Sequence, residues 1–180
     1  TNYGLILLDN SDNSTVVSTL TVGSLTNATG GTINIFDTDS SLSAGSHVID
    51  AQLTNNGILE VGANLTLSGS SADHVSNGVN GNTAEIILIN STLTVSNATS
   101  FTNGASGVIF GNGTIDANVA VTNTGILEPQ SSSATGASLT FTSGLNLESG
   151  GTVALDYYGG SNDVIYVNSG ALDLEGNIHL

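Results

Sequence analysis

The sequence predicts an all-β fold, a β-solenoid with short rungs and a few loop excursions. Three observations indicate it: the apolar runs are only a few residues long, Gly and Asn punctuate the gaps between them, and the motifs recur along the chain. Strands this short cannot bury a face alone, so they must stack on copies of themselves. No stretch combines a sustained i, i+3, i+4 apolar pattern with helix caps, so almost no helix is expected.

The stretch from Gly107 to Glu128 shows the pattern most clearly. Four short runs follow one another in it, at 108–110, 114–116, 119–121 and 125–127. Its last part, Val121 to Glu128, has an eight-residue copy upstream at Leu53 to Glu60, 68 residues earlier. Such an offset corresponds to a few turns of a solenoid with rungs of roughly 20 to 25 residues.

Shorter copies place one Thr between two apolar residues. In a strand the side chains alternate between faces, so the two apolar residues should point inward and the Thr outward. These copies begin at Leu20, Leu65, Leu93 and Leu139.

The remaining strands and loops follow from the same pattern. Strands are expected at 3–8, 15–22, 32–36, 48–53, 57–61, 65–68, 84–89 and 92–96, and again from residue 139 to the end. Loops are expected at 27–31, 37–46 and 131–136. The polar stretch 69–82 is predicted to leave the solenoid as a long loop.

The sequences from Gly111 to Pro129 and from Gly144 to Ile178 carry a resemblance to a known family. They resemble the repeat near the C-terminal end of bacterial autotransporter passenger domains and related large surface adhesins. One departure is that Gln130 follows Pro129, where family members often have Gly. The resemblance implies a right-handed, single-stranded parallel β-helix on a bacterial surface, and it implies no catalytic residue.

The charge composition excludes several classes of partner. Among 180 residues Lys+Arg is 0 and Asp+Glu is 15, which gives a formal net charge of −15. Affinity for nucleic acid or for anionic lipid headgroups depends on cationic side chains, so neither partner is expected. Cys is also 0, so the chain can form no disulfide and no thiolate metal site.

Two acidic loops are the only metal-site candidates that the sequence offers. Asp9 with Asp12, and Asp37 with Asp39, place two carboxylates within one loop, and Ca²⁺ prefers oxygen ligands of this kind. Neither loop matches an EF-hand or a Gly-Gly-x-Gly-x-Asp repeat. The alternative is that both are solvated loops without a metal.

Few residues in the sequence indicate a catalytic role, and the chain is predicted not to be an enzyme. Asp73 and His74 lie in a Ser-containing stretch, but no G-x-S-x-G motif accompanies them. Asp116 and Glu128 could serve glycoside hydrolysis only if their carboxylates converged, and they lie in repeat motifs. A carbohydrate-active enzyme on a β-helix therefore stays as the alternative, and a cleft with two convergent carboxylates would reveal it.

Both terminal segments read as uncapped strands. The candidate end-to-end contact residues are Leu5, Ile6, Leu7 and Leu8 near the start and Ile178 and Leu180 near the end. An open rung exposes its apolar core and unpaired backbone groups that can template another chain. We therefore expect both ends to be covered, by further rungs of a longer polypeptide or by the next subunit of a head-to-tail fibre.

The sequence thus predicts one solenoid domain, 1–180, that is a segment of a longer protein or a fibre subunit. Its expected function is non-enzymatic: a stalk, adhesin or self-associating scaffold of a secreted or cell-surface bacterial protein. The expected partners are the protein itself or molecules on host or neighbouring cells. A filament subunit that polymerises end to end is a further alternative.

Overall fold

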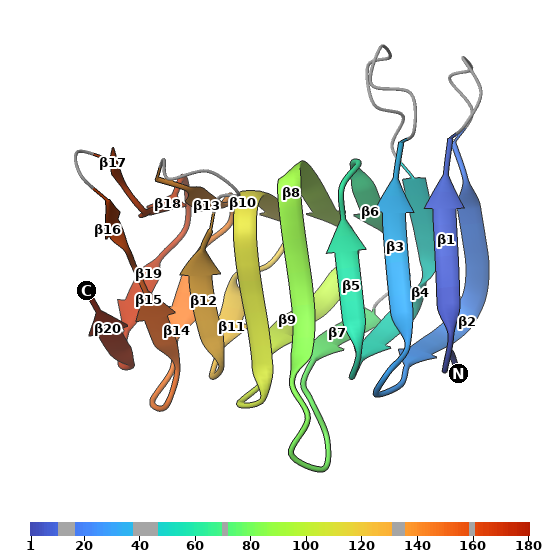
Figure 1. Ribbon diagram of the computed structural model, residues 1–180, viewed down its shortest axis with the longest axis horizontal. Coiled ribbons are helices and arrows are strands. Elements are labelled where there is room, and N and C mark those ends of the chain that lie inside the picture. Colours follow the sequence, from blue (N-terminus) through green and yellow to red (C-terminus); the bar gives the residue numbers. More distant parts are fainter. Residues whose placement is uncertain (11–16, 38–46, 70–71, 131–135, 159–160) are drawn as a thin grey trace.

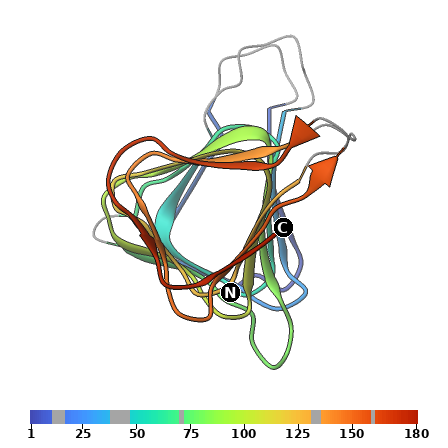
Figure 2. The same cartoon turned by 90° about the vertical axis from the view of Figure 1, so that its left-hand side faces the viewer.

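The computed structural model describes residues 1–10, 17–37, 47–69, 72–130, 136–158 and 161–180. This part of the chain contains no helix and folds into a parallel β-solenoid of about 6 turns, which confirms the predicted fold class. Figure 1 shows the rungs side by side along the long axis, with the two termini at opposite ends. Figure 2, which looks along that axis, shows the chain winding around a central core.

Parallel pairing between successive rungs defines three sides of the coil. Side A holds β1 (Leu5–Asp9), β3 (Thr32–Phe36), β5 (Ile58–Val61), the first parts of β8 (Ala84–Val95) and β10 (Gly107–Ala117), β12 (Ile126–Pro129), β15 (Thr152–Ala154) and β20 (Asn177–His179). Side B holds the first parts of β2 (Thr19–Asn27) and β4 (His47–Asn55), β6 (Leu65–Leu67), the second parts of β8 and β10, β13 (Ser138–Phe141) and β18 (Val164–Val167).

Side C completes each rung before the chain returns to side A. It holds the second parts of β2 and β4, β7 (Ala72–Ser76), β9 (Ala98–Asn103), β11 (Val121–Asn123), β14 (Leu145–Leu147) and β19 (Leu172–Leu174). These strands form one 18-stranded sheet. A separate antiparallel pair is formed by β16 (Tyr157–Tyr158) and β17 (Ser161–Asn162).

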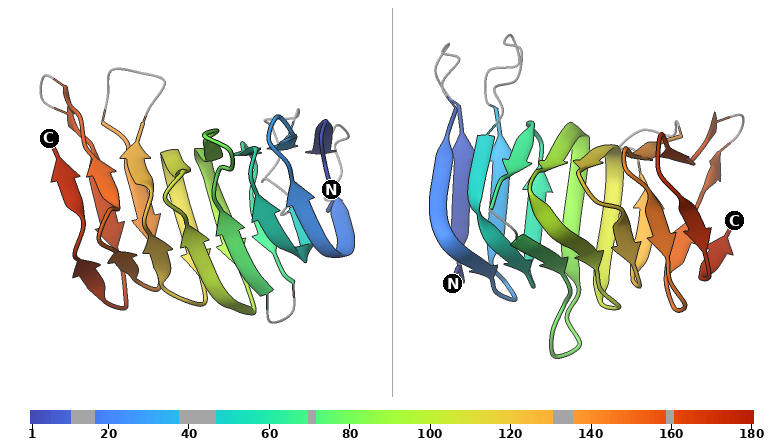
Figure 3. Two further views of the ribbon diagram at one scale, coloured as in Figure 1. Left: turned by 90° about the horizontal axis from the view of Figure 1, so that it is seen from below. Right: turned by 180° about the vertical axis from the view of Figure 1, so that it is seen from behind.

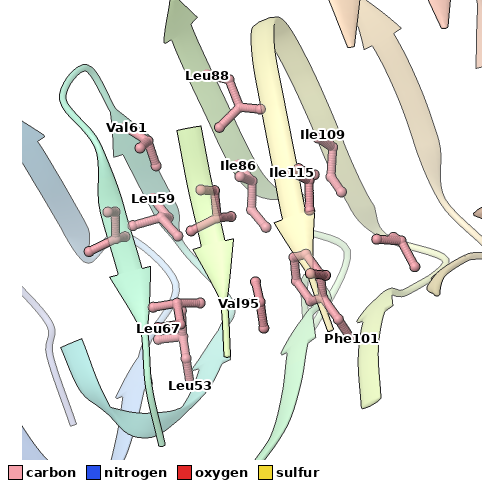
Figure 4. Close-up of a cluster of buried hydrophobic side chains, with 14 of the residues drawn as sticks. Leu53, Leu59, Val61, Leu67, Ile86, Leu88, Val95, Phe101, Ile109 and Ile115 are labelled. Carbon is pink, nitrogen blue, oxygen red and sulfur yellow. The ribbon is translucent and has the colours of Figure 1, made fainter. Parts of the chain in front are cut away.

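The core consists of files, which are rows of residues at the same position on successive rungs. One file on side A contains Ile33, Leu59, Ile86, Ile109 and Leu127, each at most 1% exposed. Figure 4 shows Leu59, Ile86 and Ile109 pointing inward with their neighbours from the other sides. Full burial of such a side chain is worth about 1.5–3 kcal/mol, so the stacked files are the main source of stability.

Most of the Thr-centred copies take the predicted orientation. The apolar pairs of β6 and β13 are buried at 0–1% exposure, and the Thr between each pair lies at the surface. In the first copy Leu20 packs against the core as predicted, but Val22 is 38% exposed, so the prediction is wrong for Val22. The reason is an irregularity in the pairing of β2 with β4 between Thr21 and Ser24, which shifts the alternation.

The predicted loop at 69–82 is wrong over part of its length. Residues 72–76 form β7, which pairs in parallel with β4 and β9. Among the described residues of this stretch, 77–83 form the loop that projects below β8 in Figure 1. Likewise β9 forms within 97–106, where no strand was predicted. Both strands place polar residues inward, among them His74, Ser76 and Asn103, so apolar periodicity could not reveal them.

The eight-residue repeat corresponds to one recurring turn from side C to side A. Its two copies end β4 and β11 and begin β5 and β12, three rungs apart. These rungs are 27, 23 and 18 residues long, so the predicted length of roughly 20 to 25 residues describes their mean and not each rung. A Cβ on Gly57 would lie 2.2 Å from the carbonyl oxygen of Gly31, and one on Gly125 would lie 2.2 Å from that of Gly107. Glycine is therefore required, because the backbones of adjacent rungs approach closely.

Candidate functional site

A buried polar file, the asparagine file, runs beside this turn through the N-terminal and central rungs. It consists of Asn2, Asn27, Asn55, Ser76, Asn103 and Asn123. The Nδ2 of Asn27 donates to Asn55 Oδ1 at 2.8 Å, and that of Asn103 donates to Asn123 Oδ1 at 2.7 Å. These amides also donate to backbone carbonyls of the turns, so each of these two pairs ties its rungs together.

Ser76 interrupts the file. Asn55 Nδ2 donates to Ser76 Oγ at 3.2 Å, but Asn103 Oδ1 on the next rung is buried and has no hydrogen-bond partner among the described residues. Beyond Asn123 the same file continues with Leu147 and Leu174. Apolar periodicity does not reveal this file, although Asn precedes Gly by two or four residues in each of its turns at Asn27, Asn55, Asn103 and Asn123.

The adjacent Asp73 and His74 do not form a catalytic pair, because strand alternation places them on opposite faces of β7. Asp73 is exposed and accepts hydrogen bonds from the hydroxyls of Thr99 and Ser100, which lower the pKa of its carboxyl group. His74 is buried, and its Nδ1 accepts the backbone N–H of Leu53 at 3.2 Å. Burial lowers the pKa of its imidazole, since the charged form would lose its hydration.

Two of the four proposed calcium ligands lie in the described part of the chain. Asp9 ends β1 in register with Phe36, so Asp37 lies on the neighbouring rung at the same edge of side A. Asp37 Oδ1 lies 3.0 Å from Nε2 of His47, whose ring is buried. Asp12 and Asp39 fall outside the described residues, and within those residues no group of three His, Asp or Glu could hold a metal ion.

The two carboxylates considered for glycoside hydrolysis lie on different sides of the coil. Asp116 lies on side B, where it accepts the Thr142 hydroxyl at 2.7 Å. Glu128 lies on side A in register with Phe110. A glycosidic bond must be flanked by both groups at once, so this pair does not form a hydrolytic site.

The C-terminal rung exposes residues whose equivalents one rung earlier are buried. Leu174 is 51% exposed and Ile178 is 53% exposed, whereas their partners Leu147 and Val153 are 1% and 4% exposed. Leu180 follows the last strand and is fully exposed. Leu174 and Ile178 keep the register of the core files, and with Leu180 they form an apolar end surface. Figure 3 shows the last strands at the C-terminal end of the coil.

The N-terminal rung divides the predicted contact residues between two faces. Leu5 and Leu7 point outward and are 66% and 53% exposed. Ile6 and Leu8 point inward and pack against the core, each half-buried. Ile6 and Leu8 therefore belong to the core at the N-terminal end of the coil. Leu5 and Leu7 belong to the outer surface of side A.

Comparisons with protein-family models, with curated proteins and with solved structures find no match to this chain. Among the described residues no helix is long and apolar enough to cross a membrane.

Proposed function

We propose that this chain is a non-enzymatic, structural and adhesive segment of a secreted or cell-surface bacterial protein. In this role the chain is a rigid rod whose outer sides keep a fixed orientation relative to one another. The observation that carries the proposal is that one parallel sheet continues through all rungs to an end surface of core-like residues. The resemblance of the C-terminal repeats to autotransporter passengers and surface adhesins supports the location.

Rigidity follows from how the rungs are joined. Adjacent rungs share backbone hydrogen bonds on each side, and the asparagine file adds directional bonds inside the turns. Solenoids of this kind gain stability from each neighbour interface, so they form elongated rods. Such a rod suits a stalk or adhesin, since it separates a binding surface from its anchor.

A filament subunit is the second candidate, in which the last rung, with the half-exposed Leu174 and Ile178, stacks on a second copy of the chain. Stacking on the rung of another copy would bury both side chains and pair the open edges of β19 and β20. In the rod proposal further rungs of the same polypeptide cover the end surface. In a filament a second copy of the chain covers it.

Electron microscopy of the purified chain separates these proposals. Single rods of uniform length support the rod segment, and long fibres support the filament, whereas compact particles contradict both. If fibres form, Ile178→Asp should shorten them because it places a charge on the end surface. Thr122→Asp, which adds the same charge on the outer surface of side C, is the matched control and should leave fibre length unchanged.

A further inference from the structure

Side A carries an outward-facing apolar patch on three adjacent strands. The side A patch is defined as Ile87, Ile89, Val108, Phe110 and Ile126, on β8, β10 and β12. The register places Ile87 beside Phe110 and Val108 beside Ile126. Ile89 and Ile126 are 43% and 39% exposed, and the other three are half-buried by their neighbours in the file. Figure 1 shows these strands side by side.

The fold does not require apolar residues at these outward positions. On the same rungs the outward residues of side B are Thr92, Thr94, Thr114, Asp116, Thr140 and Thr142, and those of side C include Thr102 and Thr122. Threonine thus forms equivalent outward files without loss of pairing. A contiguous apolar patch that packing does not demand is typical of an interaction surface.

Carboxylates surround the patch. Glu60 precedes Ile87 in its file, Glu128 follows Phe110 in the same file, and Glu85 precedes Val108 in the adjacent outward file. Asn34 Nδ2 donates to Glu60 Oε2 at 3.2 Å. Because the chain contains no Lys or Arg, no ordinary salt bridge within it neutralises these groups. A cation that pairs with this rim must therefore come from outside the chain, as a solvent ion or as a Lys or Arg of a partner.

A shallow hollow adjoins the patch at the corner between sides A and B. Apolar Ile87, Ile89 and Phe110 line one part of it, and Asn90, Asn112 and Gln130 line the other. Its volume is about 220 Å³, which is enough for one large side chain. The Nδ2 of Asn112 donates to Asn90 Oδ1 at 2.6 Å and fixes the polar wall.

We propose that the side A patch binds a cationic amphipathic peptide segment of a partner protein. Its apolar side chains would contact Phe110 and its neighbours, one of them would enter the hollow, and its Lys or Arg side chains would pair with the Glu rim. A second copy of this chain fits poorly, since it would bring Glu against Glu without any cation. The inference deepens the adhesive part of the proposed function and rests on it.

The test measures binding of the full chain to a synthetic peptide that alternates Leu and Lys, with a Ser and Lys peptide as the equal-charge comparison. Two sets of variants probe the patch. The first is Ile87→Thr, Phe110→Thr and Ile126→Thr together, because threonine occupies equivalent positions on sides B and C. The second is Glu60→Gln, Glu85→Gln and Glu128→Gln together.

A third set controls for net charge. It combines Asp50→Asn, Asp116→Asn and Glu148→Gln, which removes three carboxylates away from the patch. We expect the Leu and Lys peptide to bind more tightly than the Ser and Lys peptide. Each patch set should weaken binding about tenfold, and the control set less than about twofold.

Three results would overturn the proposal. Equal weakening by the Glu set and the control set would show diffuse attraction to a negative protein. Unchanged binding in the Thr set, with folding verified by circular dichroism, would show that the patch is not the contact. Absence of binding of the Leu and Lys peptide would show that the patch is not a site for cationic peptides, even where an uncharged oligosaccharide binds and Phe110→Thr abolishes that binding. None of these results changes rod formation in electron microscopy, so the proposed rod is tested separately.

Discussion

The turn from side C to side A is built in two ways within one coil. In the N-terminal and central rungs, except the one with Ser76, an inward Asn precedes the glycine of the turn, as in Asn103 before Gly107. In the last rungs Leu147 and Leu174 take the same position before Gly151 and Gly176. The backbone turn and its glycine are therefore the constant element, and the inward residue changes how adjacent rungs are held together.

The two solutions differ in what they specify. An amide that donates to the next amide and to turn carbonyls fixes the register of both rungs, since a shifted rung would leave buried polar groups without partners. A leucine pair gains only packing and tolerates small shifts. Four predictions follow from this difference, in order of decreasing effect.

The constant element should be the most sensitive. In Gly125→Ala the new Cβ would lie 2.2 Å from the carbonyl oxygen of Gly107 and 2.4 Å from that of Gly104. Both contacts are backbone atoms, so the free energy of unfolding should fall by about 3 kcal/mol. Gly23→Ala, where no atom lies within 4 Å, is the matched control and should change it by less than about 0.5 kcal/mol. Chemical denaturation of both variants measures the difference.

Removal of one amide from the asparagine file should lower the free energy of unfolding by somewhat less than Gly125→Ala does. Asn103→Leu deletes the donor to Asn123 Oδ1 and to the carbonyls of Gly107 and Ile126. Buried acceptors without donors should lower the free energy of unfolding by about 2 kcal/mol. Leu147→Met, in the leucine part of the file, should cost less than about 1.5 kcal/mol. Equal losses in the two variants would show that the amides do not specify the register.

Acid should weaken the central rungs through His74. Its pKa is lowered by burial in the folded state, so the unfolded state binds the proton first as the pH falls below 6.5. The free energy of unfolding should therefore decrease as the pH falls below 6.5. Thermal unfolding between about pH 7.5 and pH 5 should show this slope. His74→Leu should flatten this slope, although it also removes the acceptor of the Leu53 N–H. An unchanged slope would mean that other groups cause the pH dependence of stability.

Completion of the asparagine file at position 76 should raise the free energy of unfolding by a small amount. Ser76→Asn places an amide between Asn55 and Asn103, where it can donate to the unpartnered Oδ1 of Asn103. A new buried hydrogen bond of this kind is worth about 1 kcal/mol. Ser68→Asn, at a half-buried position on side B, serves as the control. A loss of stability in Ser76→Asn would mean that the site lacks room for the amide.

Apolar alternation predicted the solenoid because the core files consist mostly of Ile, Leu and Val. Where the inward residue is polar the same method failed: β7 was assigned to a loop because His74 and Ser76 point inward. The recurring Asn before Gly marked these turns, but only the register shows that the amides meet.

The candidate binding surface was hidden for a related reason. The run Ile86 to Ile89 reads as one apolar segment, although Ile86 and Leu88 point inward while Ile87 and Ile89 point outward. Sequence alone does not show that Ile87 lies beside Phe110, since Phe110 follows Ile87 by 23 residues in the chain. Such a surface appears only when rungs are stacked.

Side-chain amide hydrogen exchange, measured by NMR, tests the central claim that the asparagine file joins the rungs. The Nδ2 protons of Asn27, Asn55 and Asn103 are buried and hydrogen-bonded, so they should exchange slowly. Asn80 and Asn97, in exposed turns, should exchange rapidly. Equally rapid exchange at all five residues in the folded protein would contradict the account.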